Sequence, residues 1–279
     1  MIIEKSNCVP LICPSIKIKD YNIGQTNPAI FIEENGDIIV LIRLINYVKF
    51  KDYSFKIIEY PSTSNYYIGR SNINNIDNID YTILKYDYNL PVYNTYWRGI
   101  EDIRFIDEKN IILCVPELSS DGNPSLFTAE IKDDKLINFI PLPKYNIEKN
   151  WMPFSDKYIY SISPLKILSK NSHLIKICDN LELNGYHGSS NGIIWEDGHL
   201  FLIHKTINNE VFHIFFFLSD DFNQIKYSDP FKFYKYSYIE FVCSLQQYNN
   251  KLYVSLGVND SNSYIITLDK NVVKLRQDY

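Results

Sequence analysis

The segment Asn27-Pro28-Ala29-Ile30-Phe31-Ile32 leads through a polar turn into the apolar residues 38–44, and this hairpin decides the fold because it recurs. Each copy consists of a short β-rich strand, a turn rich in Asn, Asp, Ser, Gly or Lys, and a second β-rich strand. The second strands begin near residues 38, 111, 158, 199 and 251. Such spacing, about 40 to 50 residues for most intervals, is typical of propeller blades. We therefore predict an all-β fold, a five-bladed β-propeller, with residues 1–279 forming a single domain.

Polar residues interrupt the apolar pattern of several second strands: Arg43, Ser161, His204 and Ser255. Inner strands of a propeller line a central channel, so we expect these side chains to converge there. A β-sandwich with separately satisfied polar residues is the alternative. The first interval between hairpins is longer, and the Ser, Asn and Asp content of residues 62–80 predicts an exposed loop. Closing the ring requires an early strand to pair with a late one.

Composition excludes some classes of protein. The net charge of −5 argues against a nucleic-acid binder, which needs clustered cations. The five cysteines are scattered, which suits a reducing compartment. Residues 1–14 lack the pattern of a signal peptide, and no run reaches the roughly 18 apolar residues of a membrane span. We expect a soluble, cytoplasmic protein without a nucleic-acid partner.

The densest polar cluster is Trp97-Arg98-Gly99-Ile100-Glu101-Asp102-Ile103-Arg104. Alternation along a strand would send Glu101 and Asp102 to opposite faces, so that one faces a central site while an arginine holds the other. A carboxyl in a partly dry pocket has a raised pKa and can serve as a general acid. A surface salt-bridge cluster would explain the same residues.

Three further clusters carry candidate binding residues. Lys149 and Asn150 follow Glu148 and precede Trp151, a combination that suits a sugar site or packing between blades. His187 begins a Gly- and Ser-rich segment, and His204 and Lys205 lie on the next strand, where they would form an anion pocket. Glu240 and Asp260 complete the set. No carboxylate lies at a metal-binding spacing from the histidines, so no metal site is predicted.

Taken in order, these blocks resemble those of the β-mannoside phosphorylases and related mannosidases and mannosyltransferases. They are still more similar to the propeller domains attached to some bacterial glycosyltransferases. The similar blocks include Asn27-Pro28 with Arg43, Gly99 to Arg104, Lys149-Asn150-Trp151, His187-Gly188, His204-Lys205, Ser228-Asp229-Pro230-Phe231, Glu240-Phe241 and Asn259-Asp260. The resemblance runs from about residue 27 to residue 269.

The resemblance implies an inverting enzyme that phosphorolyses or transfers a hexosyl group, with mannose as the expected hexose. Asp102 would be the general acid, or the base in the synthetic direction. Arg43, Lys149 and His204 would hold phosphate or the anionic group of the donor, and Arg104, Asn150, Glu240 and Asp260 would position sugar hydroxyls. Glu101, His187 and Lys205 belong to the same substrate- or phosphate-binding set. No cofactor is implied beyond inorganic phosphate or a sugar phosphate as co-substrate.

Two departures keep other functions open. His187 stands where the phosphorylases carry an arginine, and Ile103 replaces the proline of many relatives. Histidine cannot reproduce the bidentate grip of arginine on phosphate. One alternative is a non-catalytic propeller that binds a glycan or a partner protein, and another is a hydrolase in which Glu240 activates water. The resemblance also leaves open a companion glycosyltransferase.

Overall fold

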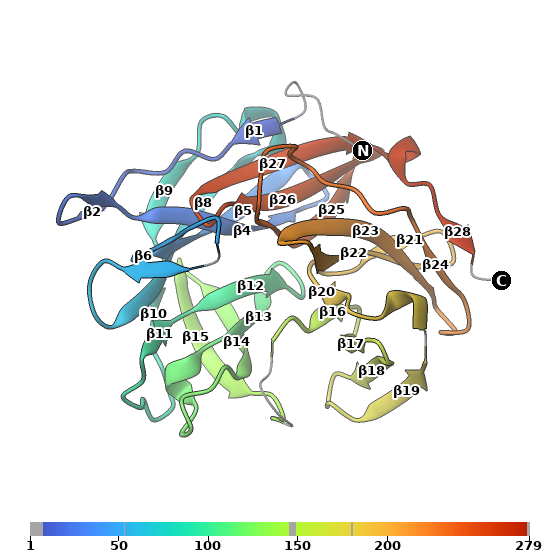
Figure 1. Cartoon of the computed structure of the whole chain (residues 1–279), viewed down its shortest axis with the longest axis horizontal. Coiled ribbons are helices and arrows are strands. Elements are labelled where there is room, and N and C mark those ends of the chain that lie inside the picture. The colour runs from blue at the N-terminus through green and yellow to red at the C-terminus, as the bar shows by residue number, and fades with distance from the viewer. Residues whose placement is uncertain (1–7, 53, 145–148, 180, 278–279) are drawn as a thin grey trace.

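The computed structural model describes residues 8–52, 54–144, 149–179 and 181–277, and it confirms a five-bladed β-propeller (Figure 1). Five mainly antiparallel sheets follow one another around a central axis, and the described residues contain no α-helix. The described part of the chain also contains the short 3₁₀ segments η2 (Ile73–Asn75), η3 (Pro116–Leu118), η4 (Leu181–Leu183) and η5 (Lys270–Val272). None of the described segments is a helix long and apolar enough to span a bilayer.

Blades 1 to 3 take their strands from residues 24–178, in chain order except that a short strand, residues 85–86, joins blade 2 although it precedes the last strand of blade 1. Blade 1 contains β4 (Gly24–Ile32), β5 (Asp37–Ile45), β8 (Ser62–Asn72), β9 (Asp80–Ile83) and β11 (Trp97–Gly99). Blade 2 contains β12 (Glu101–Phe105), β13 (Asn110–Cys114), β14 (Leu126–Lys132), β15 (Lys135–Pro141) and the short β10 (Lys85–Tyr86). Blade 3 contains β16 (Met152–Phe154), β17 (Lys157–Ile162), β18 (Leu165–Ser169) and β19 (Leu174–Cys178). The hairpins predicted from the sequence form the inner two strands of each of these blades.

Blades 4 and 5 join the two ends of the described chain to the ring. Blade 4 contains β20 (His187–Gly188), β21 (Ile193–Trp195), β22 (Gly198–Ile207), β23 (Glu210–Ser219), β24 (Ile225–Tyr227) and β28 (Arg276–Gln277). Blade 5 contains β25 (Glu240–Tyr248), β26 (Lys251–Val258), β27 (Asn262–Asp269) and β1 (Cys8–Pro10). The early strand β1 pairs antiparallel with the late strand β27, which is the expected closure of the ring.

Apolar side chains fill each space between neighbouring blades. Five buried clusters are present, one at each blade–blade interface, as expected when the inner faces of twisted sheets interdigitate. Leu41 and Leu113, for example, belong to the cluster between blades 1 and 2, and Phe215 and Val254 belong to the cluster between blades 4 and 5. The packing is therefore continuous around the ring and holds the inner strands in fixed relative positions.

The prediction of an exposed loop over residues 62–80 is wrong for residues 62–72, whereas residues 74–79 do form a largely exposed turn. Residues 62–72 form β8, which pairs with β5 from Ser64 to Asn72 and with β9 and β11 on its other edge. Its backbone is therefore satisfied on both sides, and its centre at Tyr66, Tyr67 and Ile68 is buried. The extra length of blade 1 lies elsewhere, partly in a hairpin of β6 (Tyr47–Lys49) and β7 (Phe55–Ile57). A second small hairpin joins β2 (Lys17–Ile18) to β3 (Tyr21–Asn22).

Candidate active site

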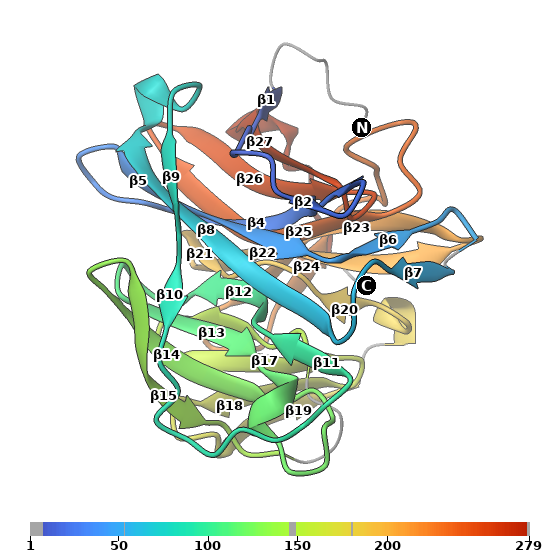
Figure 2. The same cartoon turned by 90° about the vertical axis from the view of Figure 1, so that its left-hand side faces the viewer.

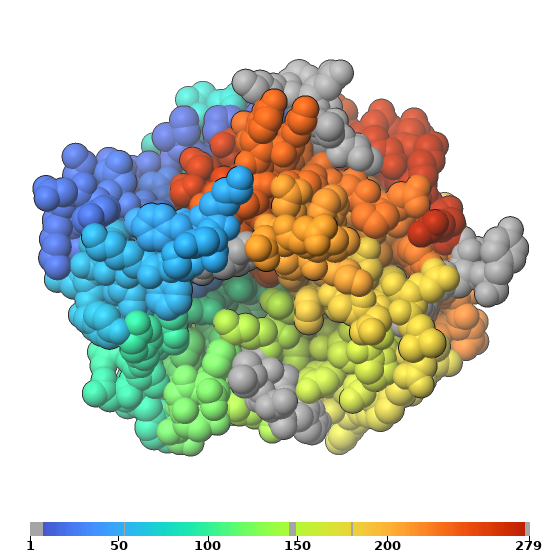
Figure 3. All heavy atoms as spheres, in the orientation of Figure 1, coloured from blue at the N-terminus to red at the C-terminus, as the bar shows by residue number. Residues whose placement is uncertain are grey.

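A polar cavity of about 430 Å³ lies where blades 1, 2 and 5 meet. Its charged lining residues are Arg43, Lys49, Glu101, Asp102, Lys149 and Asp260. The hairpin of β6 and β7 lies at the same end of the ring as β11, as Figure 2 shows. Near the centre of Figure 3, the light-blue hairpin meets the orange segment that precedes β25, where the Tyr238 hydroxyl donates to the Lys49 carbonyl at 3.1 Å. These elements make a recess with charged walls.

Arg43 binds the two carboxylates of the Glu-Asp pair. Its Nη2 lies 3.0 Å from Glu101 Oε1, and its Nη1 lies 3.0 Å from Asp102 Oδ1. Its Nε donates to Ser64 Oγ at 2.7 Å, which fixes the plane of the guanidinium. All three guanidinium nitrogens of Arg43 thus have partners within the protein. Only the edge of the guanidinium is left to contact a ligand.

A β-bulge brings both carboxylates to the cavity, so the expectation that they point to opposite faces is wrong. The register between β12 and β13 shifts between Glu101 and Arg104, and Asp102 has a positive φ of 48°. A bulge inserts one residue and re-aims the side chains beside it. A non-glycine residue in the left-handed region stores strain that is common at functional sites. Strict alternation fails at this position for that reason.

Asp102 is held in its ionised form. Burial alone would raise the pKa of Asp102, but the charges of Arg43, Arg104 and Lys149 and the hydrogen bond from Asn27 together lower it. Asn27 Nδ2 donates to the same Oδ1 as Arg43, at 2.9 Å. Asp102 can therefore accept a proton at neutral pH, and it does not have the raised pKa expected of a resting general acid.

Arg104 links the cavity to blades 3 and 4. It is buried, donates from Nη1 to the Asp102 carbonyl at 3.0 Å, and donates from Nη2 to Asn150 Oδ1 at 3.1 Å. Its Nε donates to the Ser189 carbonyl. Lys149, beside Asn150, lies 3.4 Å from Glu101 Oε2 and is half exposed. Glu148 lies outside the described residues.

The histidine cluster is less basic than the sequence suggested. His204 Nδ1 lies 2.6 Å from Ser189 Oγ, and burial, together with the charges of His213, His187 and Arg104, lowers the pKa of His204 to about 3. His204 is therefore neutral at pH 7 and adds no positive charge for an anion. His187 is its cross-strand partner and is exposed beside a second cavity of about 400 Å³ that Lys149 and Asn150 also line.

Two predicted site residues point away from the polar cavity. Lys205 donates to the Asn184 carbonyl at 2.7 Å and lies over the Tyr186 ring. Glu240 is buried and accepts from the backbone amides of Phe233 and Tyr234 at 2.9 and 2.7 Å. Glu240 does not line the polar cavity, and these amides occupy both of its carboxylate oxygens.

The four polar residues of the second strands do not converge on one site. Arg43 lines the polar cavity and His204 bonds to Ser189. Ser161 donates to the Pro164 carbonyl of its own hairpin, and the buried Ser255 hydroxyl accepts from the Ser244 amide at the bulge of β25. The last two are explained by local backbone geometry.

Sequence reasoning missed the aromatic wall of the cavity and the cation Lys49. Tyr47, Trp97 and Phe241 line it, and the Tyr47 and Trp97 rings lie 5.8 Å apart, edge to face. Tyr47 and Lys49 follow Arg43 at intervals of four and six residues, the same-face spacing of an extended chain, which is the signal that could have identified them.

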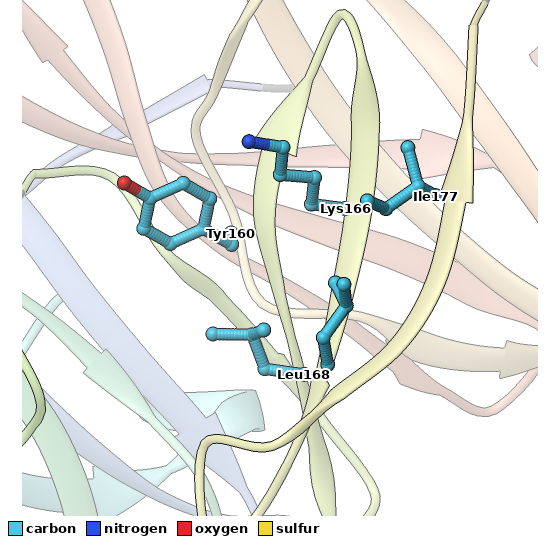
Figure 4. Close-up of a pocket in the computed structure, with 5 residues that line it drawn as sticks. Tyr160, Lys166, Leu168 and Ile177 are labelled. Carbon is cyan, nitrogen blue, oxygen red and sulfur yellow. The ribbon is translucent and has the colours of Figure 1, made fainter. Parts of the chain in front are cut away.

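The outside of blade 3 carries a different kind of pocket (Figure 4). It has a volume of about 280 Å³ and is lined by Tyr160, Lys166, Leu168, Leu174 and Ile177. These lining residues include no carboxyl group that could take or give a proton. The polar cavity, which does carry carboxyl groups, is therefore the candidate active site rather than this apolar pocket.

The structure resembles those of carbohydrate-active enzymes. The β-1,2-mannobiose phosphorylase from Listeria innocua matches with a TM-score of 0.62 over 96% of each chain at 15% identity. A GH43 β-xylosidase/α-arabinofuranosidase from a compost microbial metagenome matches with a TM-score of 0.62 over 98% of this chain and 97% of that one at 10% identity. A mannose phosphorylase from Leishmania mexicana, in complex with phosphate ion, has a TM-score of 0.50 over 92% of this chain and 88% of that one at 11% identity.

The fold is thus a five-bladed propeller similar in structure to a mannobiose phosphorylase and to a glycosidase. The resemblance to the GH130 β-mannoside phosphorylases, drawn from the sequence blocks, is confirmed for the fold. No family model and no curated protein sequence matches the chain.

Proposed function

We propose that this protein is a carbohydrate-active enzyme that forms or breaks a glycosidic bond to a hexose, mannose by resemblance, through inverting transfer or phosphorolysis. The observation that carries the proposal is the ionised Asp102, held by Arg43 and Asn27 at the wall of a cavity that also has an aromatic side. Sugar rings bind against aromatic faces while polar groups address their hydroxyls, and this cavity offers both.

The protonation state of Asp102 favours the synthetic direction. An ionised carboxylate can take the proton of an acceptor hydroxyl as that oxygen attacks the anomeric carbon of the donor. Inversion requires the attacking and leaving groups to lie on opposite faces of the sugar. Lys149 and Lys49, with the remaining edge of Arg43, are the cations that line the cavity and suit the phosphate of a sugar 1-phosphate donor.

The charge balance of the cavity lends support to hydrolysis as the second candidate. Three cations line the cavity together with three carboxyl groups, so an incoming phosphate meets positive charge that is already partly compensated. A neutral glycoside and a water molecule would not need that charge. The likeness to both phosphorylases and a glycosidase is compatible with either reaction.

The test is phosphate release from α-mannose 1-phosphate in the presence of mannose or glucose acceptors. Wild type should release phosphate, and Asp102→Asn should lower kcat by about 10²- to 10⁴-fold, the usual contribution of a general base. The exposed Asp229 provides a matched control, because Asp229→Asn should behave as wild type. Release of mannose from β-mannosides without phosphate would identify a hydrolase. Absence of turnover with sugar binding retained would show a binding protein.

A further inference from the structure

The three carboxyl groups that line the polar cavity have unequal surroundings. Both oxygens of Glu101 face cations, Arg43 at 3.0 Å and Lys149 at 3.4 Å. Asp102 accepts hydrogen bonds from Arg43 and Asn27 on one oxygen. Among the described residues, the cation within 4 Å of the Asp260 carboxylate is Lys49, whose Nζ lies 3.8 Å away. The ion pair of Asp260 is therefore the longest of those made by the three carboxyl groups.

Asp260 is fixed in place by its turn. It lies between β26 and β27, where Asn259 and Asp260 have φ values of 54° and 49°. The Asn259 side-chain oxygen accepts from the amides of Tyr238 and Ile239 at 3.1 and 3.2 Å, which ties the turn to the start of β25. The Asp260 side chain is 11% exposed. The carboxyl group is thus presented to the cavity from a rigid support.

The electrostatic surroundings keep Asp260 protonated more readily than an ordinary aspartate. Burial raises the pKa of Asp260, and the charges of Asp102 and Glu101 raise it further, against the opposing effect of Lys49 and Arg43. The nearby phenols of Tyr47 and Tyr238 have raised pKa values, chiefly through burial, and remain neutral. The cavity therefore holds one carboxyl group whose pKa is lowered, Asp102, and another whose pKa is raised, Asp260. Paired carboxyls whose pKa values are shifted in opposite directions are the arrangement used for a base and an acid.

We propose that Asp260 is a second catalytic residue, the proton donor to the leaving group of the donor sugar, with Asp102 as the base for the acceptor. This assignment rests on the proposed function. The bond between the anomeric carbon and the leaving oxygen breaks, its electron pair stays on the phosphate, and that oxygen takes the Asp260 proton. The acceptor oxygen bonds to the anomeric carbon and gives its proton to Asp102. Exchange with solvent then restores both carboxyls.

The proposal is tested with two donors that differ in their need for a proton. The leaving group of α-mannose 1-phosphate is phosphate, which departs as a highly charged oxyanion unless it is protonated. The leaving group of α-mannosyl fluoride is fluoride, which departs without a proton donor. Asp260→Asn should lower kcat/KM at least 100-fold with the phosphate donor and less than about fivefold with the fluoride, since general-acid catalysis is worth about 10²- to 10⁴-fold. Asp102→Asn should impair both reactions. The Asp229→Asn variant is the surface control.

The outcomes separate this inference from the proposed function. Wild type that is inactive with both donors would remove the proposed function itself. If wild type is active with both donors and Asp260→Asn loses kcat/KM equally with the two, the proposed role of Asp260 is overturned. The proposed function would then still stand. The pH profile of wild type gives an independent reading that does not depend on a variant. The rate with the phosphate donor should fall as the pH rises through the pKa of Asp260, and the rate with the fluoride should lack that decline.

Discussion

Glu101 and Glu240 occupy corresponding places, because each is the first residue of the innermost strand of its blade and each is buried. Their partners differ. Glu101 is held by the side-chain cations Arg43 and Lys149 at the wall of a cavity. Glu240 is held by two backbone amides, by Ser237, and by His213 at 3.5 Å, in a fully enclosed space. A buried carboxylate is thus compatible with either a reactive site or a structural one, and the partners decide between them.

Among changes to the residues around Glu101, replacing Arg43 should have the largest effect on kcat/KM. Arg43→Lys keeps the charge but cannot hold Glu101, Asp102 and Ser64 at once, because lysine lacks the planar fork. We expect kcat/KM to fall about 100-fold or more, since Asp102 loses its orientation. Steady-state kinetics with the phosphate donor, with circular dichroism as a check on folding, measures this. Unchanged kinetics would show that the Arg43 contacts do not position Asp102.

Replacing Glu240 should affect stability instead of chemistry. Glu240→Ala leaves buried donors without an acceptor and should lower the free energy of unfolding by about 3 kcal/mol, with kcat of the folded protein unchanged. Urea unfolding monitored by fluorescence gives the value. The pKa of Glu240 is lowered, since His213, Ser237 and the backbone amides outweigh burial. The stability that its charge contributes is present above the usual glutamate pKa and is lost as the pH falls through the lowered one. The free energies of unfolding of wild type and of Glu240→Gln should therefore become equal at acidic pH.

The aromatic wall should contribute less than either carboxylate cluster. Trp97 lines the cavity and packs against Tyr47, Phe55 and Tyr96. Trp97→Ala should raise KM for the sugar about tenfold, equivalent to about 1.4 kcal/mol, with a smaller change in kcat. Trp97→Phe, which keeps an aromatic face, should restore most of the affinity. Equal KM values for wild type and Trp97→Ala would place the sugar elsewhere.

The smallest expected effect is a gain in stability at Asp260. Its raised pKa means that ionisation is unfavourable in the folded state, so its contribution to stability declines as the pH rises from the usual aspartate range through the raised value. Asp260→Asn removes that cost and should stabilise the protein at pH 7 by about 1 kcal/mol, a rise in Tm of about 2 to 4 °C. The gain should disappear at pH 4. A lower Tm at pH 7 would show that the carboxylate is needed for packing.

The repeat in the sequence was sufficient to predict the fold because hairpins depend on local signals. Turns of Asn, Asp and Gly fix where a strand ends, and the five second strands begin within one residue of the predicted positions. The strand β8 escaped prediction because its ends are rich in Ser and Asn. Those polar residues are tolerated because both of its edges are paired, and Ser64 is buried against Arg43. Pairing between distant segments is not visible in local composition.

The site was predicted in part, because side-chain direction depends on details that residue types do not encode. Arg43, Glu101, Asp102, Lys149 and Asp260 line one cavity, and their roles there stay predictions. The bulge that turns Asp102 inward has no clear signature in Glu-Asp-Ile-Arg. Glu240 points to the amides of a segment near it in sequence, and His204 loses its charge through burial that only the assembled blades create.

Ring closure by β1 and β27 affects when the polar cavity can form during synthesis and whether fragments of the chain can contain it. Because the walls of the polar cavity run from Asn27 on the first blade to Asp260 on the last, no shorter contiguous fragment contains the complete site. During synthesis the blades emerge from the ribosome one after another, and the polar cavity can form only after Asp260 has been translated. Two fragments cut between blades should each contain only part of the cavity lining and should each be inactive. Turnover that returns when the two fragments are mixed would show that the ring has reassembled.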